Sequence, residues 1–74
     1  LEIHTDLIPA GGRVLLIDDV LATGGTAIAA IDLLKMAELN PVCIAFLLEI
    51  PALGGRSRIA KAHPDVKIAT ILAE

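Results

Sequence analysis

The sequence has 74 residues, 55% of them hydrophobic and 1% aromatic, and six Lys and Arg against nine Asp and Glu leave a formal net charge of −3. This length allows one small domain at most, or a part of a larger one, and the acidic balance argues against a general nucleic-acid binder, which needs a basic surface for phosphates. The apolar composition argues against disorder, and a single cysteine allows no internal disulfide. Gly, Pro and charged residues interrupt every apolar stretch, which argues against a membrane span. We therefore expect a cytoplasmic protein without a nucleic-acid or membrane partner.

The first part of the chain predicts two strands separated by a turn. Residues 1–4 alternate loosely and form either an edge strand or the tail of a loop, and Pro9 with the glycines at 11 and 12 marks a turn. Residues 13–18 include four consecutive large aliphatic side chains, which is typical of a strand covered on both faces in a parallel sheet. We expect this strand to end at Asp18 and Asp19.

The rest of the chain alternates between helix and strand. Good helix formers run over residues 25–39, and their apolar side chains spread so widely that we expect this helix to be covered on more than one side. We then expect a strand over 42–48, a loop over 51–55, a short helix over 56–62 and a strand over 66–72. This order predicts an α/β fold with a Rossmann-like parallel sheet and a right-handed βαβ unit.

The apolarity is high for a domain of this size, which buries only about 60% of the surface that its unfolded chain exposes. So many Leu, Ile, Val and Ala residues would leave apolar patches on the outside. We therefore expect residues 1–74 to form a single partial domain, the C-terminal half of a larger one. A very apolar autonomous domain is the alternative.

The residues that follow the first buried strand suggest a binding site. Ligands in open α/β sheets bind beyond the carboxyl ends of strands, which is where we expect Asp18 and Asp19. The loop after them leads into a helix, whose first N–H groups are unpaired and whose partial positive charge favours an anion. This loop consists of Ala22, Thr23, Gly24, Gly25 and Thr26. Carboxylates for hydroxyls or a hydrated metal, beside a cradle for one phosphate, match a sugar phosphate.

Other interpretations of this segment stay open. An Asp after a strand is often only a turn or cap residue, and Thr-Gly-Gly-Thr alone is an ordinary turn. The acid pair also resembles the start of a response-regulator receiver domain, which needs a later Asp and a Lys at strand ends, where this chain has Glu49 and an early Lys67. Neither a Walker A motif nor a G-x-G-x-x-G fingerprint occurs in the sequence.

Residues 15–26 resemble the phosphoribosyl pyrophosphate motif of type I phosphoribosyltransferases. Residues 1–6, 45–50 and 53–56 resemble the adenine branch of that family. The resemblance implies purine salvage, in which adenine and phosphoribosyl pyrophosphate give AMP and pyrophosphate. Alternatives are a non-catalytic regulatory module of the same fold that binds purines or nucleotides, and a phosphoribosyltransferase for another base such as xanthine.

The resemblance also implies roles for particular residues. Asp18 and Asp19 would hold the ribose hydroxyls and help to stabilise an oxocarbenium-like transition state, and the loop 22–26 would bind the 5′-phosphate. Ile50 would lie near the purine. Mg²⁺ would accompany the diphosphate, with no direct ligand from this chain. The family usually forms homodimers, and its acid–base glutamate is expected upstream of Leu1, so the chain alone should lack complete catalysis.

Three basic residues and a histidine follow the predicted loop over 51–55. Arg56, Arg58 and Lys61 are expected to form a solvated helix face, with a contact to a partner or to the lid over the purine as the alternative. His63 precedes a proline and is expected in a turn.

Overall fold

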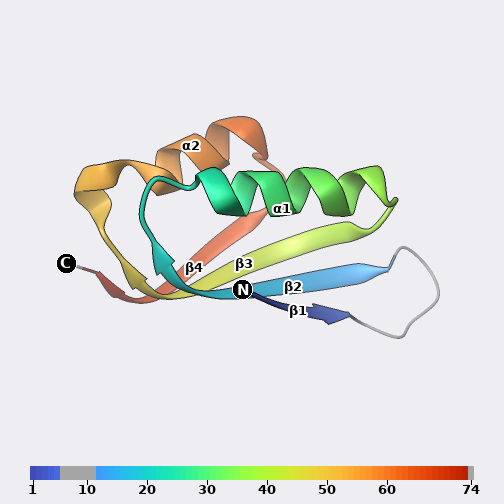
Figure 1. The fold of residues 1–74 in the computed structure, drawn as a ribbon, viewed down its shortest axis with the longest axis horizontal. Helices are drawn as coiled ribbons and strands as arrows, with labels where there is room; N and C mark the ends of the chain where they lie inside the picture. The colour runs from blue at the N-terminus through green and yellow to red at the C-terminus, as the bar shows by residue number, and fades with distance from the viewer. Residues whose placement is uncertain (6–11, 74) are drawn as a thin grey trace.

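The computed structural model describes residues 1–5 and 12–73 and folds them into one sheet with two α-helices (Figure 1). The strands are β1 (Glu2–Thr5), β2 (Arg13–Leu21), β3 (Asn40–Glu49) and β4 (Lys67–Ala73). The helices are α1 (Gly25–Met36), the short 3-10 helix η1 (Pro51–Leu53) and α2 (Gly55–Ala62). No helix in these ranges is long and apolar enough to cross a membrane. The predicted turn at Pro9 and Gly11 lies outside the described residues.

The sheet is mostly parallel and follows the order of the chain. Its strands lie in the order β1-β2-β3-β4, with β2, β3 and β4 parallel and β1 antiparallel to β2. The α/β class is therefore confirmed, while the edge strand makes the sheet mixed. Both crossovers step in the same direction across the sheet, and right-handed crossovers of that kind place both helices on one face (Figure 1).

The hydrophobic core lies between the two helices and this face of the sheet. Ile31 from α1, Ile59 from α2 and Phe46 from β3 are all almost completely buried there. The other buried apolar residues are Val14, Leu16, Leu21, Ala27, Leu34, Ile44 and Val66. Leu21, Ala27 and Phe46 belong to this core and also line the pocket described below.

The opposite face of the sheet is apolar but has no covering element among the described residues. Leu15 on β2 is 36% exposed and Leu47 on β3 is 51% exposed. On α1, the outward side chains Leu33 and Met36 are 66% and 80% exposed. The predicted covering of strand and helix on more than one side is not supplied by the described residues and stays a prediction, because an apolar pattern reports how hydrophobic a surface is and not which neighbour covers it.

Helix α1 ends three residues before the predicted boundary. Glu38 adopts a left-handed backbone conformation with φ 62°, which stops the helix and lets the amide of Leu39 donate to the carbonyl of Leu34 at 3.0 Å. Asn40 and Pro41 then open β3. A proline at the beginning of a strand is tolerated because its missing donor removes few ladder bonds.

Candidate functional site

Strand β2 continues past the two aspartates and ends at Leu21. Asp18 and Asp19 therefore lie inside the strand, which corrects the prediction that the strand ends with them. Since successive side chains of a strand point to opposite faces, the two carboxylates diverge. Asp18 points to the side covered by the helices and lines a pocket, whereas Asp19 is exposed and is absent from the pocket lining.

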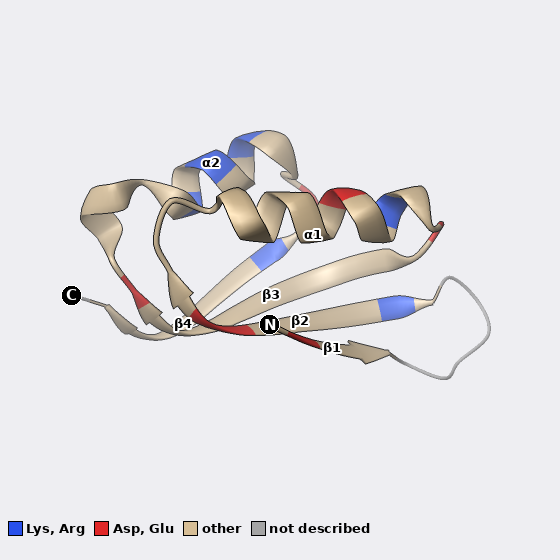
Figure 2. Ribbon diagram, in the orientation of Figure 1, with Lys and Arg blue, Asp and Glu red and all other residues tan. Residues whose placement is uncertain are grey.

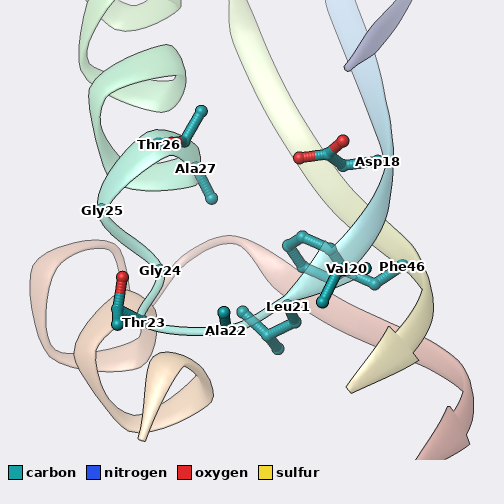
Figure 3. Close-up of a pocket in the computed structure, with 10 residues that line it drawn as sticks. All are labelled: Asp18, Val20, Leu21, Ala22, Thr23, Gly24, Gly25, Thr26, Ala27 and Phe46. Carbon is teal, nitrogen blue, oxygen red and sulfur yellow. The ribbon is translucent and has the colours of Figure 1, made fainter. Parts of the chain in front are cut away.

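The pocket lies between the end of β2 and the N-terminal turn of α1 and has a volume of about 100 Å³ (Figure 3). Its lining residues are Asp18, Val20, Leu21, Ala22, Thr23, Gly24, Gly25, Thr26, Ala27 and Phe46. The structure thus brings together Asp18 and all five predicted loop residues. In Figure 3, Asp18 extends from β2 toward the first turn of α1, above the ring of Phe46.

The first turn of α1 presents backbone donors at this pocket. Gly24 is the N-cap residue with φ 85°, and no side chain caps the helix. The amide of Ile28 donates to the carbonyl of Gly24 at 2.9 Å, and the preceding amides of the helix have no acceptor within it. These amides and the positive end of the helix dipole favour an anion at the N-terminus of α1.

The carboxylate of Asp18 is held at the pocket wall by a backbone contact. Its Oδ1 atom accepts a hydrogen bond from the amide of Asp19 at 2.9 Å. The side chain is 22% exposed. Among the lining residues Asp18 is the only charged one, so backbone amides and hydroxyls supply the donors of this pocket.

Ile50 follows β3 and does not line the pocket. Its amide donates to the carbonyl of Leu21 at 2.9 Å, which joins the ends of β3 and β2. Its side chain is half-buried. The structure therefore places Ile50 beside the strand end that forms one wall of the pocket.

An ion pair that the sequence did not predict connects α2 to the sheet. Glu49, at the end of β3, is 8% exposed, and Arg56 donates to it from Nη2 at 2.9 Å and from Nε at 3.2 Å. Thr70 on β4 donates a further bond to Glu49 at 3.2 Å. The hydrogen bonds from Arg56 lower the pKa of Glu49 against the opposing effect of burial. Arg56 is 44% exposed, in agreement with the expected solvated helix face, but the sequence did not indicate its ion pair with Glu49. Figure 2 shows the basic positions along α2.

Removing the charge of Glu49 is expected to destabilise the protein in a pH-dependent way. Glu49→Gln should lower the free energy of unfolding by about 1.5–3 kcal/mol at pH 7, the range for hydrogen bonds to charged groups. Because the pKa of Glu49 is lowered on folding from 4.5, its contribution is fully present above pH 4.5 and is lost as the pH falls through the lower folded value. Urea unfolding from pH 3 to pH 7 measures this difference, with exposed Glu38→Gln as a control; a difference that persists unchanged at low pH would contradict it.

A second polar cluster joins α1 to the turn after α2. His63 is 6% exposed; its Nε2 lies 2.7 Å from Asp32 and its Nδ1 lies 3.0 Å from the ammonium of Lys35. Lys35 also donates to Asp65 at 2.8 Å, which lowers the pKa of that exposed carboxyl. The sequence placed His63 in a turn but did not indicate this network, because its members are about thirty residues apart in the chain. The cluster does not contribute to the pocket lining.

Comparison with known proteins relates the sequence and fold of this chain to phosphoribosyltransferases. The family model described as uracil phosphoribosyltransferase matches residues 3–74. The adenine phosphoribosyltransferase of Acidothermus cellulolyticus is 54% identical over 59 residues, which are 80% of this chain and 33% of that protein. The chain spans about a third of the length of the curated relatives that it matches.

Solved structures of such proteins superimpose on most of the chain. The adenine phosphoribosyltransferase of Rhodothermus marinus is 45% identical with a TM-score of 0.80, over 93% of this chain and 38% of that one. The enzyme from Trypanosoma brucei, solved in complex with AMP, pyrophosphate and ribose-5-phosphate, is 32% identical with a TM-score of 0.77, over 86% of this chain and 29% of that one.

Proposed function

The chain belongs to the type I phosphoribosyltransferase family and is homologous to adenine phosphoribosyltransferases, and from this membership we propose that its pocket binds the ribose 5-phosphate part of phosphoribosyl pyrophosphate and of AMP. The whole protein would transfer the phosphoribosyl group to N9 of adenine and release pyrophosphate. The observation that carries the proposal is the pocket in which Asp18 faces the amides of the loop 22–26. The Trypanosoma relative, whose complex holds AMP, pyrophosphate and ribose-5-phosphate, supports the choice of ligand.

The 5′-phosphate is assigned to the first turn of α1. The unpaired amides of this turn and the hydroxyls of Thr23 and Thr26 offer hydrogen bonds to phosphate oxygens. Gly24 and Gly25 allow the backbone to approach the ligand closely because they carry no side chain. The lining contains no basic residue that would take over this role.

The ribose is assigned to the acidic side of the pocket. The carboxylate of Asp18 would accept hydrogen bonds from the ribose hydroxyls and stabilise the positive charge that develops on the sugar during transfer. Asp19 is exposed on the other side of the strand and would reach the same hydroxyls only if the end of β2 twists on binding. Ile50, fixed to Leu21 at the strand end, would lie on the side of the base.

Mg²⁺ fits this pocket as a companion of the substrate. It prefers phosphate oxygens and water, with one or two carboxylates, and Asp18 is a carboxylate at the edge of the pocket. The described residues contain no group of three or more His, Cys, Asp or Glu side chains that could hold a metal by themselves. When bound, the ion would neutralise the charge of the diphosphate leaving group.

We propose that residues 1–74 bind the phosphoribosyl ligand but do not catalyse the complete transfer reaction by themselves. We also propose that the whole protein forms a homodimer. The chain spans about a third of its relatives, so other segments of the whole protein would supply the acid–base group. The uncovered apolar face with Leu15 and Leu47 is consistent with covering by further segments or by a second subunit.

The proposal predicts that AMP binds to this chain more tightly than adenosine does. A phosphate held by several amides should make the difference at least about tenfold, equivalent to about 1.4 kcal/mol. Asp18→Asn should weaken both ligands by about tenfold, because both carry ribose, while Asp19→Asn should have a smaller effect. Isothermal titration calorimetry measures these affinities, and equal binding of AMP and adenosine by the unmodified chain would refute the phosphate site.

A further inference from the structure

The first turn of α2 packs against the glycine loop (22–26). Gly55 is buried, and a Cβ atom at this position would overlap the carbonyl oxygen of Ala22 and lie 2.8 Å from Cδ1 of Leu21. A Cβ atom on Gly24 would in turn lie 2.8 Å from the carbonyl oxygen of Gly55. The loop and the helix therefore touch backbone to backbone, on the side away from the pocket.

One side chain of α2 bonds directly to the loop. Nη1 of Arg58 donates to the carbonyl oxygen of Thr23 at 3.1 Å, across 35 residues of sequence. The described residues contain no cis peptide, and in a trans peptide the C=O and the following N–H point in opposite directions. Because the carbonyl of Thr23 is held toward Arg58, the amide of Gly24 is directed away from α2.

Helix α2 is itself anchored where it makes this contact. Arg56 is tied to Glu49 and lies 3.3 Å from Thr70 Oγ1 and from the carbonyl of Ile68, and Ile59 is completely buried in the core. Arg58, between these two residues, is thus attached to a fixed helix, although its own side chain is exposed. A donor that is attached to a fixed helix can hold the orientation of the peptide it bonds to, whereas a donor on a mobile segment would move with that peptide.

We propose that Arg58 is a positioning residue that orients the Thr23–Gly24 peptide so that the Gly24 amide is ready to bind an anion. This inference rests on the proposed phosphate site and deepens it, since it names a residue 35 positions downstream of Thr23 that prepares that site. Arg58 acts through the loop backbone and does not itself line the pocket. Arg58 is exposed, as predicted for a solvated helix face, and its bond to the loop is a contact that the sequence did not indicate.

Arg58→Met tests the proposal, because methionine keeps much of the length and loses the donor. We expect the affinity of the 74-residue chain for AMP to fall about five- to tenfold, the value of one hydrogen bond, with the affinity for adenosine and the Tm unchanged. Arg58→Gln, a neutral side chain that can still donate, should recover part of the loss. Lys61→Met removes the same charge from the same helix without this bond and should change AMP affinity by less than about twofold.

A readout without ligand separates this proposal from the phosphate site. The Gly24 amide resonance in ¹H–¹⁵N spectra should shift in Arg58→Met relative to the unmodified chain, and its response to added inorganic phosphate should shrink. An unchanged Gly24 resonance overturns the positioning role, even if the unmodified chain does not prefer AMP. Equal losses of AMP affinity in Arg58→Met and Lys61→Met would also overturn it, because they would indicate a long-range charge effect.

Discussion

Gly24→Ala is expected to abolish the preference of this protein for AMP over adenosine. Gly24 has φ 85°, a conformation that costs a residue with a side chain about 1–2 kcal/mol. Its Cβ would also lie 2.8 Å from the carbonyl oxygen and 3.2 Å from the Cα atom of Gly55. These are backbone atoms that cannot rotate away, so the loop has to move off α2 and its amides leave the anion site.

Gly54→Ala is the matched control for this prediction. Gly54 also has a left-handed backbone, with φ 71°, but a Cβ at this position meets nothing within 4 Å. Both variants should lose about 1–2 kcal/mol of unfolding free energy through backbone strain, and Gly24→Ala should lose more through the clash. Denaturation and calorimetry with AMP and adenosine measure the two effects. An AMP preference that survives Gly24→Ala would contradict the assignment of the loop.

Phe46→Ala is expected to have the largest effect on stability. The ring of Phe46 is 2% exposed, belongs to the core between the sheet and the helices, and forms part of the pocket wall. Truncating a buried Phe costs about 3–5 kcal/mol through lost transfer energy and the cavity that remains. A domain of this size is stable by only about 4–11 kcal/mol at the usual 0.05–0.15 kcal/mol per residue. The variant should therefore unfold at a much lower urea concentration.

Leu47→Ala, one residue further along β3, provides the comparison. Leu47 is 51% exposed because it points to the uncovered face of the sheet. Its truncation should cost less than about 1 kcal/mol if this face is open to solvent in the isolated chain. Similar losses for the two variants would mean that the second face is covered in solution, for example by another copy of the chain.

The elements and the pocket loop could be predicted from local patterns. The aliphatic run of β2, the helix formers of α1 and the small residues at 22–26 each specify their own conformation within a few neighbours. The helix end was less predictable, because Glu38 takes a left-handed conformation that usually belongs to glycine. The prediction that β2 ends at the aspartate pair was wrong because Val20 and Leu21 continue the strand beyond it.

By itself, the sequence determined the α/β class, the order of its elements and the loop that leads into α1, because these depend on side-chain periodicity and on residues close together in the chain. The tertiary structure alone decided that Asp18 and not Asp19 faces the pocket, that both helices cover one face, and that Glu49, Arg56 and Arg58 join distant segments. Such contacts depend on the handedness of the crossovers and on the alternation of side chains along a strand of known length. A shift of one residue in the register of a strand moves its side chains to the other face, and the pairing with neighbouring strands sets that register.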